Sequence, residues 1–194
     1  MPYRNTSFTP HHCYHIYNRG NHRETVFIEE YNYIHFLRRL RKYLPPDKIT
    51  ILAYCLMPNH YHLLIEIREE CDVSNMMKNL IISYTKAINL RYNVVGHLFQ
   101  GRFHSKEVDS ERYLLTLIRY IHNNPVAAQL VSKREEWKYS SYAEYLGIRE
   151  NSISSPGRVI SLFSSIEEFT VFSEGLPMKE HRAMSSALFP RSTW

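Results

Sequence analysis

Two histidines separated by one residue, His60 and His62, are the first residues whose types and spacing could do chemistry. Side chains two positions apart on a strand point the same way, so both imidazoles can share one divalent ion. The segment 60–67 alternates, with apolar side chains on the face opposite the histidines. The pattern predicts that the histidines lie on the face away from the core helices. The alternative is a pair of ordinary solvated or hydrogen-bonded histidines.

A second group of candidate residues lies on the helix predicted over 110–123. At ~100° per residue, its leucines and isoleucines form an apolar stripe, and Tyr113, Tyr120 and Asn124 lie in a narrow sector beside it. This sector could reach a site at the edge of a sheet, where a tyrosine can act as a nucleophile. The alternatives are a half-buried helix tyrosine, and an asparagine that caps a turn beginning at Pro125.

Basic residues stand beside aromatic ones in two further segments. Arg102, His104 and Lys106 alternate onto one face of a predicted strand, and Arg19 and Arg23 lie in a turn near the N-terminus. A positive surface with aromatic side chains is typical of proteins that bind single-stranded nucleic acid, although an ordinary solvated surface is the alternative. The aromatic candidates for stacking on bases are Tyr17, Phe99 and Phe103.

Four segments in this order resemble the signatures of one known family. They are 57–64 (MPNHYHLL), 96–103 (GHLFQGRF), 119–126 (RYIHNNPV) and 137–142 (WKYSSY). The first looks like the HUH motif of single-tyrosine transposases, and the others resemble the motifs of the REP-associated tyrosine transposase branch. The resemblance extends from about residue 14 to residue 147, and it implies DNA binding, DNA transposition and DNA recombination.

The resemblance implies a role for each candidate residue. His60 and His62 would be ligands of Mg²⁺ or Mn²⁺, and Asn124 would be the third protein ligand. Tyr120 would be the nucleophile, which leaves a 5′-phosphotyrosine and a free 3′-OH, and Tyr113 is the alternative nucleophile. The substrate would be single-stranded DNA that contains a hairpin, and the protein would act as a monomer or a homodimer.

Two other functions use parts of the same pattern. A sheet with basic and aromatic residues can bind single-stranded nucleic acid without cutting it. An HUH endonuclease of the replication-initiator or relaxase kind would use the same chemistry for another purpose. The pairs His60–His62 and Tyr120–Asn124 favour an enzyme over a binder, because a binder needs neither pair.

The hydrophobic periodicity predicts the elements that must position these residues. Strands are expected at 13–17, 49–56, 60–67 and 102–107, and helices at 29–44, 74–91 and 110–123. The order β-α-β-β-α-β-α predicts an α+β fold, a ferredoxin-like antiparallel sheet with helices on one face. The other face would then be open to a ligand.

Composition bounds the rest of the interpretation. The chain of 194 residues has a net charge of +5 and three cysteines, without a CxxC pair. A disulfide scaffold, a thiolate zinc site and a membrane span are therefore not expected. No apolar signal segment precedes the first strand, so a cytoplasmic location is expected. The transposase-like domain is predicted over 1–147, with a partly helical extension over 148–194 whose last ~20 residues are weakly ordered.

Overall fold

A four-stranded antiparallel sheet with the order β2-β3-β1-β4 forms the centre of the protein. Its strands are β1 (Cys13–Arg19), β2 (Ile49–Met57), β3 (His60–Ile67) and β4 (His104–Val108). The structure is a computed structural model that describes residues 7–175 and 177–190. The sequence predictions for residues 1–6, 176 and 191–194 lie outside the described residues.

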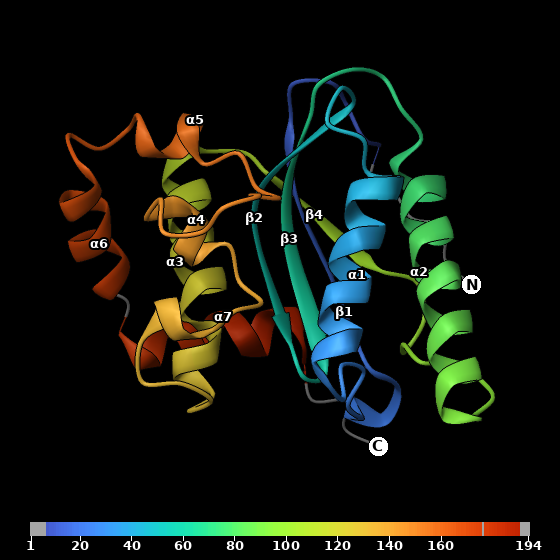
Figure 1. Ribbon diagram of the computed structural model, residues 1–194. Helices are drawn as coiled ribbons and strands as arrows, with labels where there is room; N and C mark the ends of the chain where they lie inside the picture. Colours follow the sequence, from blue (N-terminus) through green and yellow to red (C-terminus); the bar gives the residue numbers. More distant parts are fainter. Residues whose placement is uncertain (1–6, 176, 191–194) are drawn as a thin grey trace.

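Helices α1 (Glu30–Tyr43) and α2 (Val73–Tyr92) cover one face of the sheet (Figure 1). The alternation along β3 sends Tyr61, Leu63 and Ile65 into the core beneath these helices, as the sequence predicts. The α+β fold, the antiparallel sheet and the order of its elements are confirmed. Each of the predicted strands and helices begins and ends within a few residues of its predicted bounds.

The opposite face of the sheet is also covered, so the prediction of helices on only one face, with the other face open, is wrong. Helix α3 (Glu111–Ala127) lies on this face, chiefly against β2, and its Leu117 and Ile121 belong to a second hydrophobic core that includes Leu64 of β3. The remaining helices of this layer are α4 (Tyr142–Tyr145), α5 (Gly157–Ile160), α6 (Ile166–Glu174) and α7 (Met178–Leu188). Two short 3-10 turns complete the described elements, η1 (Asn21–Arg23) after β1 and η2 (Arg134–Glu136) after α3. Figure 1 shows α3 to α7 on the side of the sheet away from α1 and α2.

The C-terminal part of the chain is more ordered than the sequence predicts. The segment 151–156 returns to the sheet, where the Ser155 amide donates a 2.8 Å hydrogen bond to the Ile51 carbonyl. Helix α7 occupies most of the region expected to be weakly ordered. Within the residues that the structure describes, no helix is long and apolar enough to cross a membrane.

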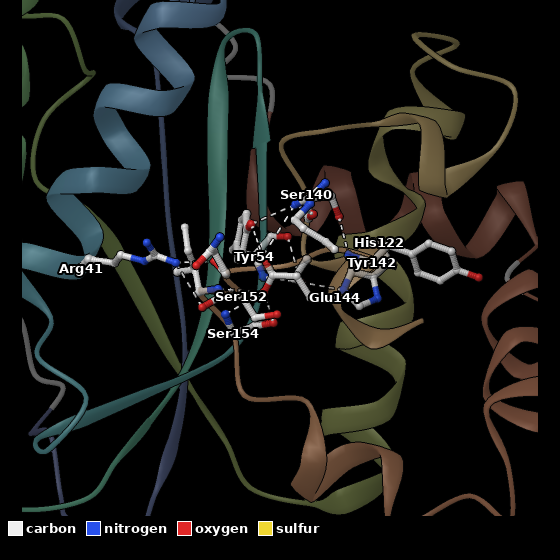
Figure 2. A network of polar contacts seen from close by, with 12 residues as sticks. Arg41, Tyr54, His122, Ser140, Tyr142, Glu144, Ser152 and Ser154 are labelled. Atoms are coloured by element: carbon white, nitrogen blue, oxygen red, sulfur yellow. Dashed lines mark hydrogen bonds and ion pairs between the residues drawn. The ribbon is translucent and has the colours of Figure 1, made fainter. Parts of the chain in front are cut away.

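A buried carboxylate, Glu144, attaches this C-terminal part to the edge strand β2 (Figure 2). The Tyr54 hydroxyl donates a 2.6 Å hydrogen bond to Glu144 from β2. From the returning segment, the amide and hydroxyl of Ser154 donate at 2.7 and 2.6 Å, and the amide of Ile153 donates at 3.1 Å. Arg149 lies 3.6 Å from the same carboxylate and offsets its charge.

Replacing this carboxylate is expected to destabilise the fold. In Glu144→Ala, the buried donors of Tyr54 and Ser154 lose their acceptor, and unsatisfied buried donors with a disrupted charged network cost about 3 kcal/mol. Urea unfolding should show that decrease in the free energy of unfolding. The matched control is Glu150→Ala, which removes a carboxylate from an exposed position and should change stability by less than ~0.5 kcal/mol. An equal stability of both variants would contradict the structural role of Glu144.

Candidate active site

A tight turn between β2 and β3 positions the two candidate histidines. Pro58 and Asn59 form the turn, because Met57 pairs with His60 across the hairpin. The Gly20 amide donates a 2.7 Å hydrogen bond to the Asn59 carbonyl and ties the turn to the end of β1. The rings of His60 and His62 leave the same face of β3, with centroids 5.1 Å apart. This is the face away from α1 and α2, as predicted, although α3 and α7 now cover it.

His62 is fully buried in the middle of the sheet. Its Nδ1 lies 3.0 Å from the Nε2 of His15, and its Nε2 has no hydrogen-bond partner among the described residues. Burial lowers the pKa of His62 well below its usual value, and the neighbouring His60, His15 and His181 lower it further. The imidazole is therefore neutral at pH 7, with a lone pair available on one ring nitrogen.

His60 has a comparable environment at the start of the strand. Its Nδ1 lies 2.7 Å from the side-chain oxygen of Asn59. Burial lowers the pKa of His60 to about 4, although a hydrogen bond with the Asn124 side chain acts in the opposite direction. His60 is therefore also neutral at pH 7, and Asn124 of α3 lies against it.

Helix α3 brings Tyr120 against His62. The two rings meet edge to face, with centroids 5.3 Å apart, and Tyr120 is fully buried. Burial raises the pKa of Tyr120 to about 12, although nearby Ser185 and Asn124 lower it. The hydroxyl has no partner with full hydrogen-bond geometry in the described part of the chain. The site thus lies on one face of β3, which is an inner strand of the sheet, and not at the sheet edge as the sequence suggested.

Asn124 belongs to the helix and does not cap a following turn. Helix α3 continues through Pro125 to Ala127, and the Asn124 amide group donates a 2.9 Å hydrogen bond to the Tyr120 carbonyl one turn earlier. The capping alternative is therefore wrong, because packing on the sheet keeps the residue before proline helical. One helical turn separates Tyr120 from Asn124, so both face the histidines of β3.

Tyr113, the alternative nucleophile, lies elsewhere on the same helix. It precedes Tyr120 by seven residues, which corresponds to about 10 Å along the axis. The Nζ of Lys106 lies 4.5 Å from the centre of its ring. The tyrosine that α3 places against His62 is Tyr120.

Arg19 and Arg23 lie beside the histidines. Together with Asn59 and His60, they line a cavity of about 250 Å³, whose remaining walls are Ser185, Ser186 and Phe189 of α7 and its end. A cavity with two guanidinium groups next to the imidazoles can receive an anion such as a phosphate.

The basic residues of β4 face the same side of the sheet. His104 lies opposite Tyr17 of β1 and stacks on its ring at 5.2 Å, and Lys106 lies opposite His15. Arg102 precedes the strand, which begins at His104, and it is exposed. His104 and Lys106 therefore extend the polar surface from the cavity across β1 to β4.

Two of the predicted stacking residues are unavailable for bases. Phe99 and Phe103 are only 4% and 7% exposed and belong to the core beneath α1 and α2. Their assignment as DNA-stacking residues is therefore wrong. Tyr17 is half-buried and lies beside the site, so it keeps that predicted role.

No motif in the sequence points to the part of the site that α7 and the following Phe189 supply. The His181 ring stacks on the Tyr120 ring at 4.7 Å, and the Phe189 ring lies 5.3 and 5.7 Å from those of His60 and His62. The Arg19 guanidinium lies 4.9 Å from the centre of the Phe189 ring. Neither His181 nor Phe189 is near a motif in the sequence. Their contacts with the site form only when α7 packs beside it.

His15 was also missed, although the sequence held a signal for it. It alternates with Tyr17 on β1, and Tyr17 lies directly opposite His62. A strand that pairs with the His60–His62 strand brings its own histidine within reach of that pair. Among the described residues, no cluster of three His, Cys, Asp or Glu side chains can hold a metal ion.

The donor set at the meeting of β3 and α3 fits a divalent cation. It contains two neutral imidazoles, from His60 and His62, and the amide of Asn124, which contacts His60. The buried, unpartnered Nε2 of His62 is the donor expected of such a site. Nitrogen and amide-oxygen ligands with open positions suit Mn²⁺ and, less strongly, Mg²⁺.

Comparisons with known proteins identify a family and a similar fold. The family described as "Transposase IS200 like" matches residues 9–124, which include all four residues of the site named above on β3 and α3. The solved structure of a REP-associated tyrosine transposase bound to a REP hairpin is similar, with 16% identity and a TM-score of 0.62 over 80% of this chain and 98% of that one. A candidate transposase from Deinococcus radiodurans R1 has 18% identity and a TM-score of 0.43, over 63% of this chain and 96% of that one. No curated protein matches the chain.

Proposed function

The chain belongs to the IS200-like transposase family, and from this premise we propose that it cleaves and rejoins single-stranded DNA through a covalent bond to Tyr120. One observation carries the proposal: α3 places the Tyr120 ring 5.3 Å from His62, whose buried Nε2 has no partner in the described residues. A tyrosine hydroxyl and an unpartnered imidazole nitrogen from different elements thus lie close together. A protein that only bound DNA would not need this pair.

The reaction is a substitution at phosphorus. The Tyr120 oxygen attacks the scissile phosphate, and the bond to the 3′-oxygen breaks as the new O–P bond forms. The 3′-oxygen takes up a proton, which leaves a free 3′-OH and a 5′-phosphotyrosine. Attack by the 3′-OH of another strand reverses the step and joins the two strands. Because burial raises the pKa of Tyr120 to about 12, the hydroxyl must lose its proton during the attack.

His60, His62 and Asn124 would hold Mg²⁺ or Mn²⁺. When bound there, the ion would polarise the scissile phosphate and favour attack by a tyrosine hydroxyl. The two imidazoles are neutral at pH 7, because burial lowers the pKa of His60 to about 4 and lowers that of His62 as well. Both can therefore offer lone pairs without first losing a proton.

The substrate we propose is single-stranded DNA that contains a hairpin, bound by a monomer or a homodimer. The fold is shared with a protein solved in complex with a REP hairpin. The proposed contacts with the DNA backbone are Arg19, Arg23, Arg102, His104 and Lys106. Arg19 and Arg23 line the cavity, His104 and Lys106 lie on β4 opposite Tyr17 and His15, and Arg102 is exposed just before β4. The division into a domain over 1–147 and an extension over 148–194 stays a prediction.

Arg23→Gln is expected to weaken hairpin binding uniformly across sequences. The residue is exposed at the rim of the cavity, where it can contact a phosphate but no specific base. Loss of one phosphate contact should reduce the slope of log affinity against log salt by about 1. Fluorescence anisotropy at several salt concentrations measures that slope. Arg38→Gln, an exposed change on α1, should leave the slope unchanged, and an equal effect of both variants would argue against the cavity.

Phe189→Ala is expected to increase the rate of adduct formation about tenfold. The Phe189 ring contacts both histidines and Arg19, so it competes with DNA for contact with these side chains. Aromatic and cation–π contacts of about 0.5–1.5 kcal/mol each hold it in place, and losing them favours the open site. Met178→Ala, an exposed change at the other end of α7, is the control. A slower reaction in Phe189→Ala would show that the ring assists the reaction.

Incubation with Mn²⁺ and single-stranded DNA from either side of the gene tests the proposed function. Denaturing electrophoresis should show a slower-migrating protein–DNA adduct and, with a second strand, a joined product. DNA binding without any adduct would favour the non-catalytic nucleic-acid binder. An adduct that transfers only to its original strand would favour a replication-initiator or relaxase type of endonuclease.

A further inference from the structure

Neighbouring side chains occupy the Nδ1 atoms of both candidate metal ligands. The Nδ1 of His62 lies 3.0 Å from the Nε2 of His15, and the Nδ1 of His60 lies 2.7 Å from the side-chain oxygen of Asn59. His15 is fully buried on β1. Its ring contacts the rings of both His62 and Tyr17, with centroids 5.1 and 4.8 Å away, and those two rings also contact each other. Both the position and the plane of His15 are therefore set by the fold.

The chemistry of imidazole gives the contact between His15 and His62 a direction. A neutral imidazole carries one proton, so one ring nitrogen donates and the other offers a lone pair. A cation takes a lone pair, and the Nε2 of His62 is the buried atom without a partner. For this Nε2 to bind a cation, the proton of His62 must lie on Nδ1. The Nε2 of His15 must then accept a hydrogen bond from that N–H group.

We propose that His15 is a positioning residue. Its Nε2 accepts a hydrogen bond from the Nδ1–H of His62 and so directs the Nε2 lone pair of His62 toward the divalent cation. The inference rests on the proposed function, because it takes His62 as a metal ligand. A second ring nitrogen that donates to a fixed acceptor orients a metal-binding histidine and increases its basicity. Loss of that acceptor typically lowers metal affinity about 10–100-fold.

The proposed tautomer of His15 leaves one of its buried nitrogens unpaired, which is unfavourable for stability. This cost distinguishes a role in metal binding from a role in packing alone. When His15 accepts through Nε2, its own proton lies on Nδ1, a buried atom with no hydrogen-bond partner in the described residues. Unsatisfied buried donors destabilise a protein. A phenylalanine at this position would keep the ring contact with Tyr17 and remove the unpaired Nδ1 of His15, but it would also leave the Nδ1 proton of His62 without an acceptor. These two effects oppose each other, so stability should change little in His15→Phe, while metal affinity falls.

The test is the affinity of the full chain for Mn²⁺ alone, without DNA, measured by isothermal titration and by electron paramagnetic resonance. His15→Phe is expected to bind Mn²⁺ about 10–100-fold more weakly than the wild type, with a Tm close to that of the wild type. His15→Gln, whose side-chain carbonyl can accept the same proton, should stay within about threefold of the wild type. Nitrogen-15 spectra of the histidine rings, recorded with Mg²⁺, should show the His62 proton on Nδ1 in the wild type. In His15→Phe they should show a mixture of the two neutral tautomers of His62.

The controls separate failure of this inference from failure of the proposed function. A wild type that does not bind Mn²⁺, or a His62→Ala variant that binds it normally, would overturn both. Wild-type affinity in His15→Phe, together with loss of affinity in His62→Ala, would overturn the role of His15 alone. An equal loss in His15→Phe and His15→Gln with a lowered Tm would show that His15 acts through packing, and it would overturn that role too.

Discussion

Tyr120→Phe is expected to lower covalent adduct formation at least ~10³-fold and to leave hairpin binding within about twofold of the wild type. The substitution removes the attacking oxygen and nothing else from the site. Its hydroxyl has no partner with full hydrogen-bond geometry in the described part of the chain, so the phenylalanine leaves no group newly unpaired. The ring keeps its contacts with His62 and His181. The variant should therefore fold normally and fail only in chemistry.

The measurement is the adduct yield on denaturing gels, beside hairpin affinity and Tm for each variant. Tyr113→Phe is the matched control, because it removes a tyrosine hydroxyl from the same helix at a position beside Lys106. It should retain the adduct. An adduct that persists in Tyr120→Phe and disappears in Tyr113→Phe would transfer the nucleophile to Tyr113.

His62→Ala is expected to abolish Mn²⁺ binding and to lower cleavage at least ~10³-fold, because metal activation of a phosphate contributes several kcal/mol to such a reaction. His60→Ala should behave in the same way, and EDTA should have the same effect on the wild type. The nitrogen lost in His62→Ala is the buried Nε2 that has no partner among the described residues.

Cleavage and Mn²⁺ titration with the purified variants check this expectation. His97→Ala removes an exposed imidazole from the loop before β4 and is the control for nonspecific effects. Cleavage by the wild type that continues unchanged in EDTA would contradict the metal role of His60 and His62. It would leave the role of Tyr120 as a nucleophile to be judged separately by Tyr120→Phe.

The local pattern along β3 was enough to predict the common face of His60 and His62. Alternation has a period of two residues on any strand, so the face of each side chain follows from its position alone. The helix sector of Tyr120 and Asn124 follows in the same way from about 100° per residue. A continuous apolar run over residues 49–57 also indicated burial on both faces of β2, and that signal argued against an open face.

Contacts between distant segments did not follow from such patterns. Phe99 and Phe103 lie near basic residues in the sequence, yet they pack into the core beneath α1 and α2. The strongest departure is α7, whose polar sequence gives little sign of burial. Its His181 and Phe189 nevertheless cover Tyr120 and the two histidines.

The sequence by itself therefore determined the motif residues and the faces that they occupy, because these depend on local geometry that repeats within each element. Only the tertiary structure decided that α3 packs on the sheet with Tyr120 against His62, that His15 lies against His62, and that α7 covers the site. These contacts join segments that are far apart in the chain. They depend on how apolar surface from different elements is buried together, and no period within one segment records that outcome.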